Sequence, residues 1–428
     1  MKGFFFLIFI PFLFSLNHRV SVYYGNWKAY ERAYPLCDVP FELLDRLYYV
    51  FSNPTGGECN FADTYLDLEM LGPIDGRCSS ELQPDTDPLK GNMYQLSVIK
   101  QRFPNLKVFF VIGGMVYATD MHDYVITNDT AKMQAYVQSC VQMYQNYSFA
   151  FDGIDIDYEY PCLYDDTNCG DIVPAFDERD LFVKFVQEFR KQLGPSVLLS
   201  LATSADYQKI DALDLVQLNG VVDIYNIMTY DFTSGDQGDP YTGHHTQPRV
   251  NNDDPIYDRK LMSAYLAPKY FVNNGANASK INVGVAFYGR GFLISNVSVT
   301  NGPFYPSLGA ILNGTWEVGM LDFYDIQNNY MNGSVVCFDN EAKAPYIVNN
   351  EIGMFITYDN VSSIQEKVNI VEGNSYDGLF AYELTGDDNN MTLLNAMRRN
   401  ATYISSGSSK YYIKIFSVII FIIIILSE

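Results

Sequence analysis

Short apolar runs recur along the chain, separated by longer segments of mixed polarity. Runs of this length bounded by polar residues are typical of buried strands, and most of the separating segments are long enough to hold a helix. Strands that alternate with helices predict an α/β fold with a parallel sheet, and eight such units predict a (β/α)₈ TIM barrel. The predicted strands are Val20–Tyr24, Arg46–Phe51, Lys107–Ile112, Gly153–Asp157, Val197–Leu201, Ile224–Thr229, Ile281–Ala286 and Gly378–Tyr382.

One segment between predicted strands is too long for a loop. It lies between the seventh and eighth runs, at about Phe292 to Glu351, and loops of such length are rare in compact domains. The sequence therefore predicts a barrel formed by residues 19–291 and 352–400, with an insertion domain at residues 292–351.

Both ends of the chain resemble processing signals. Lys2 precedes an apolar run from Phe4 to Phe14, which predicts a secretory signal peptide over residues 1–16. Small residues at 405–409, a polar spacer and an apolar tail that ends at 426 predict a GPI-attachment signal over residues 405–428. The tail is shorter than the ~20 residues of a membrane-spanning helix, and a short membrane tail is the alternative. The protein is expected to be secreted or held at the extracellular face of the plasma membrane.

The overall charge narrows the range of partners. Lys and Arg number 28 against 50 Asp and Glu, which gives a net charge of −22. Nucleic acids and anionic lipids reward positive charge, so neither is an expected partner, and membrane contact is expected only through the C-terminal anchor. A neutral polymer remains compatible with an acidic protein, and a monomer is expected.

The cysteines, sequons and histidines agree with export and predict no metal site. The seven cysteines leave at least one unpaired, and Cys162–Cys169 or Cys59–Cys78 are the expected bridges. No CxxC spacing occurs, the adjacent pair His244 and His245 is expected in a solvated loop, and no metal or cofactor is predicted. Sequons for N-glycosylation begin at Asn128, Asn146, Asn277, Asn296, Asn313, Asn332, Asn360, Asn390 and Asn400.

The fourth predicted strand carries a row of acids. Side chains alternate along a strand, so Asp155, Asp157 and Glu159 point to one face, while Ile154 and Ile156 point to the other. An exposed sheet edge would not need the apolar neighbours, and β-branched residues do not fit a calcium-binding loop. Enclosed carboxyl groups predict shared protons, a metal, or a substrate that needs an acid of raised pKa.

This segment resembles the DxxDxDxE signature of family 18 glycoside hydrolases, the chitinases and their relatives, with Asp152, Asp155, Asp157 and Glu159 in the acidic places. The resemblance extends from about Arg19 to Arg399, through the blocks NIMTYD, VAFYGRGF, NGTWEVGMLDFYDI, KAPYIVN and LFAYELTGDD in the family order. It implies a chitinase that hydrolyses β-1,4-linked N-acetylglucosamine in chitin or chitooligosaccharides with retention. It also implies an α+β fold for the insertion.

The resemblance assigns the catalytic roles. Glu159 would act as general acid and base, and Asp157 would hold the acetamido group of the substrate, which itself replaces a second catalytic carboxylate. Asp155 would share a proton with Asp157, and the Tyr230 hydroxyl would donate to the acetamido oxygen. Asp152 has the opposite strand parity, so it is expected, with Gly153, to be structural.

The resemblance also implies a substrate-binding set and two departures from the family pattern. Val111 stands where a family serine would help to hold the inner acids, and Tyr382 stands where a tryptophan usually lies under the distorted sugar, which implies weaker binding there. An endo-β-N-acetylglucosaminidase acting on N-glycans and a weakly active chitin-binding lectin are the alternatives. The expected binding residues are Trp27, Phe51, Gly114, Met228, Asp231, Tyr288, Arg290, Glu317 and Tyr382.

Overall fold

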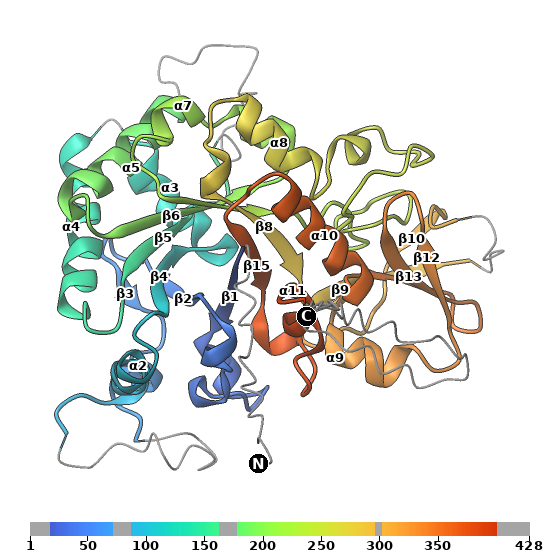
Figure 1. The fold of residues 1–428 in the computed structure, drawn as a ribbon, viewed down its shortest axis with the longest axis horizontal. Helices are drawn as coiled ribbons and strands as arrows, with labels where there is room; N and C mark the ends of the chain where they lie inside the picture. Colours follow the sequence, from blue (N-terminus) through green and yellow to red (C-terminus); the bar gives the residue numbers. More distant parts are fainter. Residues whose placement is uncertain (1–17, 72–86, 128, 162–177, 296–301, 400–428) are drawn as a thin grey trace, which may run out of the picture.

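Eight parallel strands close into a barrel in the computed structural model, which describes residues 18–71, 87–127, 129–161, 178–295 and 302–399 (Figure 1). The pairing of β1 with both β2 and β15 closes the circle, so the predicted (β/α)₈ barrel is confirmed. Closure leaves these eight strands without a free edge. The strands are β1 (Arg19–Gly25), β2 (Arg46–Asn53), β4 (Lys107–Gly113), β5 (Gly153–Asp157), β6 (Leu198–Ser204), β7 (Ile224–Met228), β8 (Ile281–Ala286) and β15 (Gly378–Tyr382); a short β3 (Asn60–Phe61) pairs with the end of β2.

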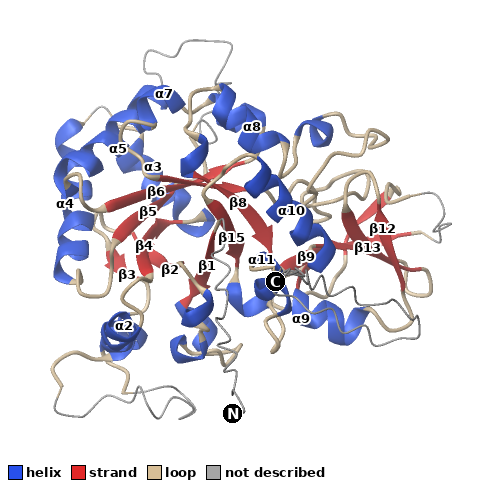
Figure 2. Ribbon diagram, viewed as in Figure 1, coloured by secondary structure: helices blue, strands red, loops and turns tan. Residues whose placement is uncertain are grey.

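Helices cover the outer face of the barrel (Figure 2). The alternation within each strand divides the interior into two cores. Ile154 and Ile156 of β5 join the core between strands and helices, while Val111 of β4 and Tyr230 belong to a separate cluster inside the barrel. The helices are α1 (Thr64–Leu68), α2 (Gly91–Arg102), α3 (Ala118–Val125), α4 (Thr130–Asn146), α5 (Glu178–Leu193), α6 (Tyr207–Asp211), α7 (Leu215–Leu218), α8 (Leu266–Asn273), α10 (Val361–Gly373) and α11 (Thr392–Met397).

A second, antiparallel sheet lies between β8 and α10 in the sequence and beside the barrel in space (Figure 2). Its strand order is β10-β9-β14-β13-β12, and β11 also pairs with β9. The sheet starts at Tyr288 and ends at Tyr358, so it extends beyond residues 292–351 at both ends. Its elements are β9 (Tyr288–Ile294), β10 (Ser307–Ala310), β11 (Met320–Asp322), α9 (Phe323–Asp325), β12 (Val335–Asp339), β13 (Ala344–Asn349) and β14 (Met354–Tyr358).

The disulfide connectivity differs from the expected one. Cys59 is bonded to Cys140 on α4, so the expected Cys59–Cys78 bridge is wrong. Cys140 lies on the buried face of α4. The two cysteines are 81 residues apart in the sequence, so their contact could not be predicted from the sequence. Cys37 is also disulfide-bonded, and Cys337 is a free thiol. The expected Cys162–Cys169 pair lies outside the described residues.

Removing the bridge should destabilise the barrel. The double substitution Cys59→Ser and Cys140→Ser should lower the free energy of unfolding by about 2–4 kcal/mol, because the bridge closes a long loop in the unfolded chain. Urea unfolding of both proteins measures the difference. Cys337→Ser is the matched control, since it removes a thiol that forms no bridge. An equal loss in that control would contradict a specific role of the bridge.

The expected terminal signals, residues 1–16 and 405–428, lie outside the described residues. Among the helices that the structure does describe, none has the length and apolar character needed to cross a membrane.

Candidate active site

Strand β5 places the acid row in the barrel interior. Asp155 is fully buried, and its carboxylate accepts hydrogen bonds from three other strands: from the Tyr23 hydroxyl at 2.8 Å, from the Ser200 hydroxyl, and from the Asn226 amide at 3.4 Å. Burial raises the pKa of Asp155 to about 6, and these hydrogen bonds oppose the rise. A carboxyl group with this pKa can gain or lose a proton near neutral pH.

The negative charge of Glu159 acts on Asp157. Burial and the charges of Glu159 and Asp155 raise the pKa of Asp157, whose Oδ1 is buried without a hydrogen-bond partner in the described part of the structure. Burial also raises the pKa of Glu159, against hydrogen bonds from the Tyr160 hydroxyl and the Met115 amide. The negative charges of Glu159 and Asp155 oppose the ionisation of Asp157, so the protonated form of Asp157 is favoured.

Two glycines at the end of β4 let the chain pass close to the acid row. The Gly114 amide donates to the Asp157 carbonyl at 2.7 Å. A Cβ at Gly113, where φ is 103°, would overlap that same carbonyl. Gly114 therefore supports the strand end that carries Asp157.

Aromatic rings enclose the space above the acids. The Tyr230 ring centroid lies 6.0 Å from that of Tyr288 and 6.3 Å from that of Tyr382. Met228 is half-buried and packs against the same cluster. Desolvation and the charge of Asp157 raise the pKa of Tyr230, so its hydroxyl stays protonated and can donate a hydrogen bond.

Asp231 is held by residues of β9. Its carboxylate accepts hydrogen bonds from the Tyr288 hydroxyl and from Arg290 Nε, both at 2.8 Å. Against desolvation, the Arg290 guanidinium and His245 hold the pKa of Asp231 below its ordinary value. Asp231 is therefore a fixed anion beside Tyr230.

The expectation of a solvated loop for His244 and His245 is wrong. Both side chains are buried, because the second sheet covers their loop: the His245 amide donates to Thr357 Oγ1 of β14 at 3.2 Å. The His245 ring lies 5.2 Å from the Tyr288 ring, and its Nδ1 is 3.6 Å from Asp231 Oδ1. His245 is therefore a site residue that sequence reasoning missed.

Tyr23, Ser200 and Asn226 were also missed. A partial signal existed, because a polar side chain at an inward-facing position of a buried strand needs a partner there. Val111 is fully buried and lies opposite Asp155 in the β4–β5 register. The hydroxyl absent at Val111 is therefore supplied from the other side of β5, by Ser200 of β6.

Asp152 lies away from the acid row. Its carboxylate accepts hydrogen bonds from Lys100, from Lys107 at 3.1 Å and from the Val108 amide at 2.9 Å. The structure thus gives Asp152 contacts that tie β4 and α2 to the start of β5. Gly153 is required by packing, because a Cβ there would overlap the Leu198 carbonyl.

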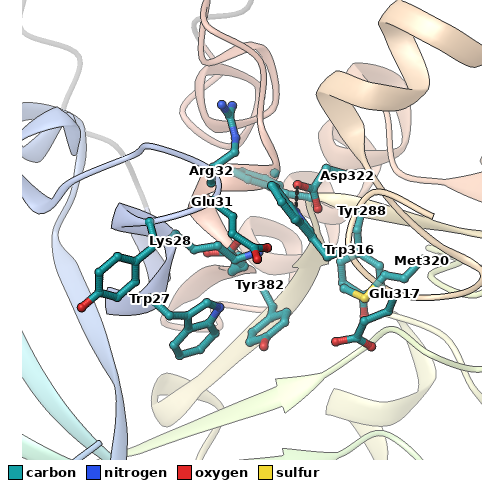
Figure 3. A pocket seen from close by; sticks show the side chains of 14 residues that line it. Trp27, Lys28, Glu31, Arg32, Tyr288, Trp316, Glu317, Met320, Asp322 and Tyr382 are labelled. Carbon is teal, nitrogen blue, oxygen red and sulfur yellow. Dashed lines mark hydrogen bonds and ion pairs between the residues drawn. The ribbon is translucent and has the colours of Figure 1, made fainter. Parts of the chain in front are cut away.

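A cavity of about 370 Å³ opens beside Tyr288 and Tyr382, between the barrel and the second sheet (Figure 3). It brings together four of the expected binding residues, Trp27, Tyr288, Glu317 and Tyr382. Trp316 and Met320 line it as well, and the Trp27 ring is 38% exposed, as a stacking ring must be. The side chain of Phe51 lies outside the described residues.

A barrel with neighbouring carboxyl groups at the C-terminal end of a strand is an arrangement that glycoside hydrolases use. The sequence pattern of the glycosyl hydrolases family 18 matches residues 19–387, and the chain belongs to this family.

Similar proteins carry chitinase names. Chitinase A1 of Niallia circulans is 28% identical over 89% of this chain, which spans 58% of that protein's length. The chitinase of Autographa californica nuclear polyhedrosis virus is 29% identical to this chain. The match covers 88% of this chain and 71% of the length of the viral protein. Among solved structures, the Group IV chitinase of Ostrinia furnacalis in complex with allosamidin is 26% identical, with a TM-score of 0.72 over 90% of this chain and all of its own.

Proposed function

We propose that the protein hydrolyses the β-1,4 linkages of chitin and chitooligosaccharides with retention of the anomeric configuration. The observation that carries the proposal is the placement of Glu159 at the C-terminal end of β5, where its charge acts on the buried Asp157 and where Tyr230 is also buried. Family membership and the names of the relatives support the same substrate.

Glu159 begins the reaction as an acid. It donates its proton to the glycosidic oxygen, so that the leaving sugar departs as a neutral alcohol. The acetamido oxygen of the remaining sugar attacks the anomeric carbon, and the resulting cyclic cation is balanced by Asp157, which accepts the acetamido N–H. Tyr230 donates its hydroxyl to the acetamido oxygen and aligns it.

The second step uses the same groups in reverse. Glu159, now ionised, takes a proton from a water molecule whose oxygen attacks the anomeric carbon from the side that the leaving sugar vacated. Two inversions give net retention. Asp155 holds the proton that it shares with Asp157 during the time that Asp157 is negatively charged.

A panel of substrates tests the proposal. Purified protein should release soluble sugars from colloidal chitin and from labelled chitooligosaccharides, and NMR of the fresh product should show the β-anomer. A high-mannose glycoprotein should remain intact. Release of a whole glycan from that glycoprotein without action on chitin would favour an endo-β-N-acetylglucosaminidase instead.

The Ser200 hydroxyl should be needed for full activity. Ser200→Ala removes a hydrogen bond to the Asp155 carboxylate, and the loss of ~1.5–3 kcal/mol for such a bond predicts a kcat at least about tenfold lower. Adding Val111→Ser should restore part of the rate, because residue 111 of β4 lies next to Asp155 on the side of β5 away from Ser200. Turnover of a labelled chitooligosaccharide measures both variants, with Ser97→Ala on α2 as control. Failure of the second substitution to raise the rate would contradict this account of Asp155.

Export and GPI anchoring complete the proposal. They are supported by the signal-like ends of the sequence and by the exposure of several sequon asparagines, among them Asn146, Asn277, Asn313 and Asn390. Asn360 differs, because its side chain caps α10 by accepting from the Ser363 amide. Expression in a eukaryotic cell, followed by treatment with a phosphatidylinositol-specific phospholipase, should release the protein from the cell surface.

A further inference from the structure

The segment that follows β1 forms one wall of the cavity and is anchored at its base. It comprises the short helix η1 (Asn26–Ala29) and the residues up to Arg32. The side-chain amide of Asn26 donates from Nδ2 to both carboxylate oxygens of the buried Asp67, at 3.1 and 3.0 Å. The wall therefore begins from a fixed point of the barrel, directly before Trp27.

Lys28 joins this segment to two other parts of the molecule. Its Nζ lies 3.2 Å from Glu383 Oε1, just beyond β15, and both side chains are almost buried. The same Nζ lies 5.1 Å from the centroid of the Trp316 ring, within cation–π range. Trp316 is itself fixed, since its Nε1 donates to Asp322 Oδ2 at 2.7 Å, the dashed line in Figure 3.

Arg32, further along the wall, also contacts two other parts of the molecule. Its guanidinium carbon lies 4.1 Å from the centroid of the Tyr324 ring, and its Nε donates to the Thr385 carbonyl at 3.1 Å. Lys28 and Arg32 thus each contact both the second sheet's domain and the segment after β15. The cavity is bounded there by a wall that is in place before any ligand arrives, as preorganised sites are.

The wall runs from Trp27, which lies beside Tyr382, to Arg32, which lies farther from the catalytic end. Figure 3 shows Tyr382 and Arg32 well separated, with Lys28 and Glu31 between them. Glu159 does not line the cavity, whereas Tyr382 does. A sugar held above Tyr382 with its scissile bond at Glu159 therefore directs its non-reducing neighbours into the cavity and toward the wall.

We propose that this wall makes the protein an exo-acting enzyme, which takes the non-reducing end of a chitin chain and releases short fragments of uniform length. The inference rests on the proposed hydrolysis of chitin. A cavity of about 370 Å³ is near the small end of the range for ligand sites, ~300–1,000 Å³. It has room for only a short segment at the end of a chain, and in this proposal the wall, whose Lys28 and Arg32 line the cavity, stops a chain that continues beyond that segment.

Product lengths test the inference. On chitohexaose labelled at its reducing end, the wild-type protein should release one short unlabelled product from the start, while the labelled remainder shortens in equal steps. On soluble glycol chitin, viscosity should fall little while reducing ends accumulate. A random distribution of lengths with an early loss of viscosity would overturn the inference and leave the proposed function standing. If neither substrate is cleaved, both are overturned.

Opening the wall should change the pattern. The double substitution Lys28→Ala and Arg32→Ala removes its contacts, so the loss of viscosity per cleaved bond should rise several-fold and the products should become mixed in length. Trp316→Ala provides a second route to the same opening. Lys191→Ala, which removes an exposed lysine on α5, is the matched control. Thermal unfolding verifies that each variant is folded, and a folded double variant that retains the wild-type pattern would contradict the assignment of the wall.

Discussion

Glu159→Gln should abolish hydrolysis of chitooligosaccharides while leaving their binding intact. Glutamine preserves the size of the side chain but has no acidic proton to transfer, and general acid catalysis contributes about 10²–10⁴-fold in rate. Burial raises the pKa of the wild-type carboxyl group and so favours the protonated form that the first step needs. We expect kcat to fall by at least the lower of these factors, with a dissociation constant within a few-fold of the wild-type value.

Two measurements are needed, because loss of turnover alone could reflect loss of fold. Turnover of a labelled chitooligosaccharide gives kcat, and calorimetric titration with an unlabelled one gives the dissociation constant. Glu69→Gln, at an exposed position after α1, is the matched control and should behave like the wild type. Turnover near the wild-type level in Glu159→Gln would remove Glu159 from the catalytic role.

The raised pKa of Glu159 also fixes one side of the pH profile. The first step needs the protonated form, so activity should fall as the pH rises through the pKa of Glu159 in the substrate complex. An unperturbed glutamate would lose its proton near pH ~4.3 and leave little activity at neutral pH. The pH dependence of kcat on a soluble substrate measures the position of that limb.

The barrel strands were predictable because strands buried on both faces are continuous apolar runs. All eight coincide with observed barrel strands, with ends that differ by a few residues. The acid row was equally accessible, since strand parity alone places Asp155 and Asp157 on one face. These features depend only on residues close together in the sequence.

The features that could not be predicted from the sequence all depend on contacts between segments that are distant in the sequence. Tyr23 reaches Asp155 only because barrel closure places β1 across the interior from β5, and Ser200 reaches it because β6 pairs with β5. His245 is buried only because the second sheet folds over its loop. The Cys59–Cys140 bridge requires α4 to pack against the end of β2 and β3. No local pattern distinguishes such residues from ordinary polar or buried ones.

Asp157→Asn should lower kcat by about 10²–10³-fold, the usual loss when one group that stabilises developing charge is removed. Asparagine is neutral, so it cannot balance the positive charge that forms when the acetamido oxygen attacks the anomeric carbon. Binding of the unreacted substrate should change far less, because that charge is absent before the reaction. The split between kcat and the dissociation constant separates this role from a purely structural one.

The same substitution should stabilise the fold at neutral pH. In the unfolded chain Asp157 ionises above pH ~3.9, whereas burial and its acidic neighbours delay ionisation in the folded protein. The contribution of Asp157 to the stability of the wild type therefore falls as the pH rises above ~3.9, and each unit of pKa difference corresponds to about 1.4 kcal/mol. Asparagine carries no such cost, so Asp157→Asn should gain in free energy of unfolding relative to the wild type between pH 4 and pH 7. Urea unfolding at both pH values measures the gain, and an unchanged difference between the two proteins would show that Asp157 ionises as freely in the barrel as in the unfolded chain.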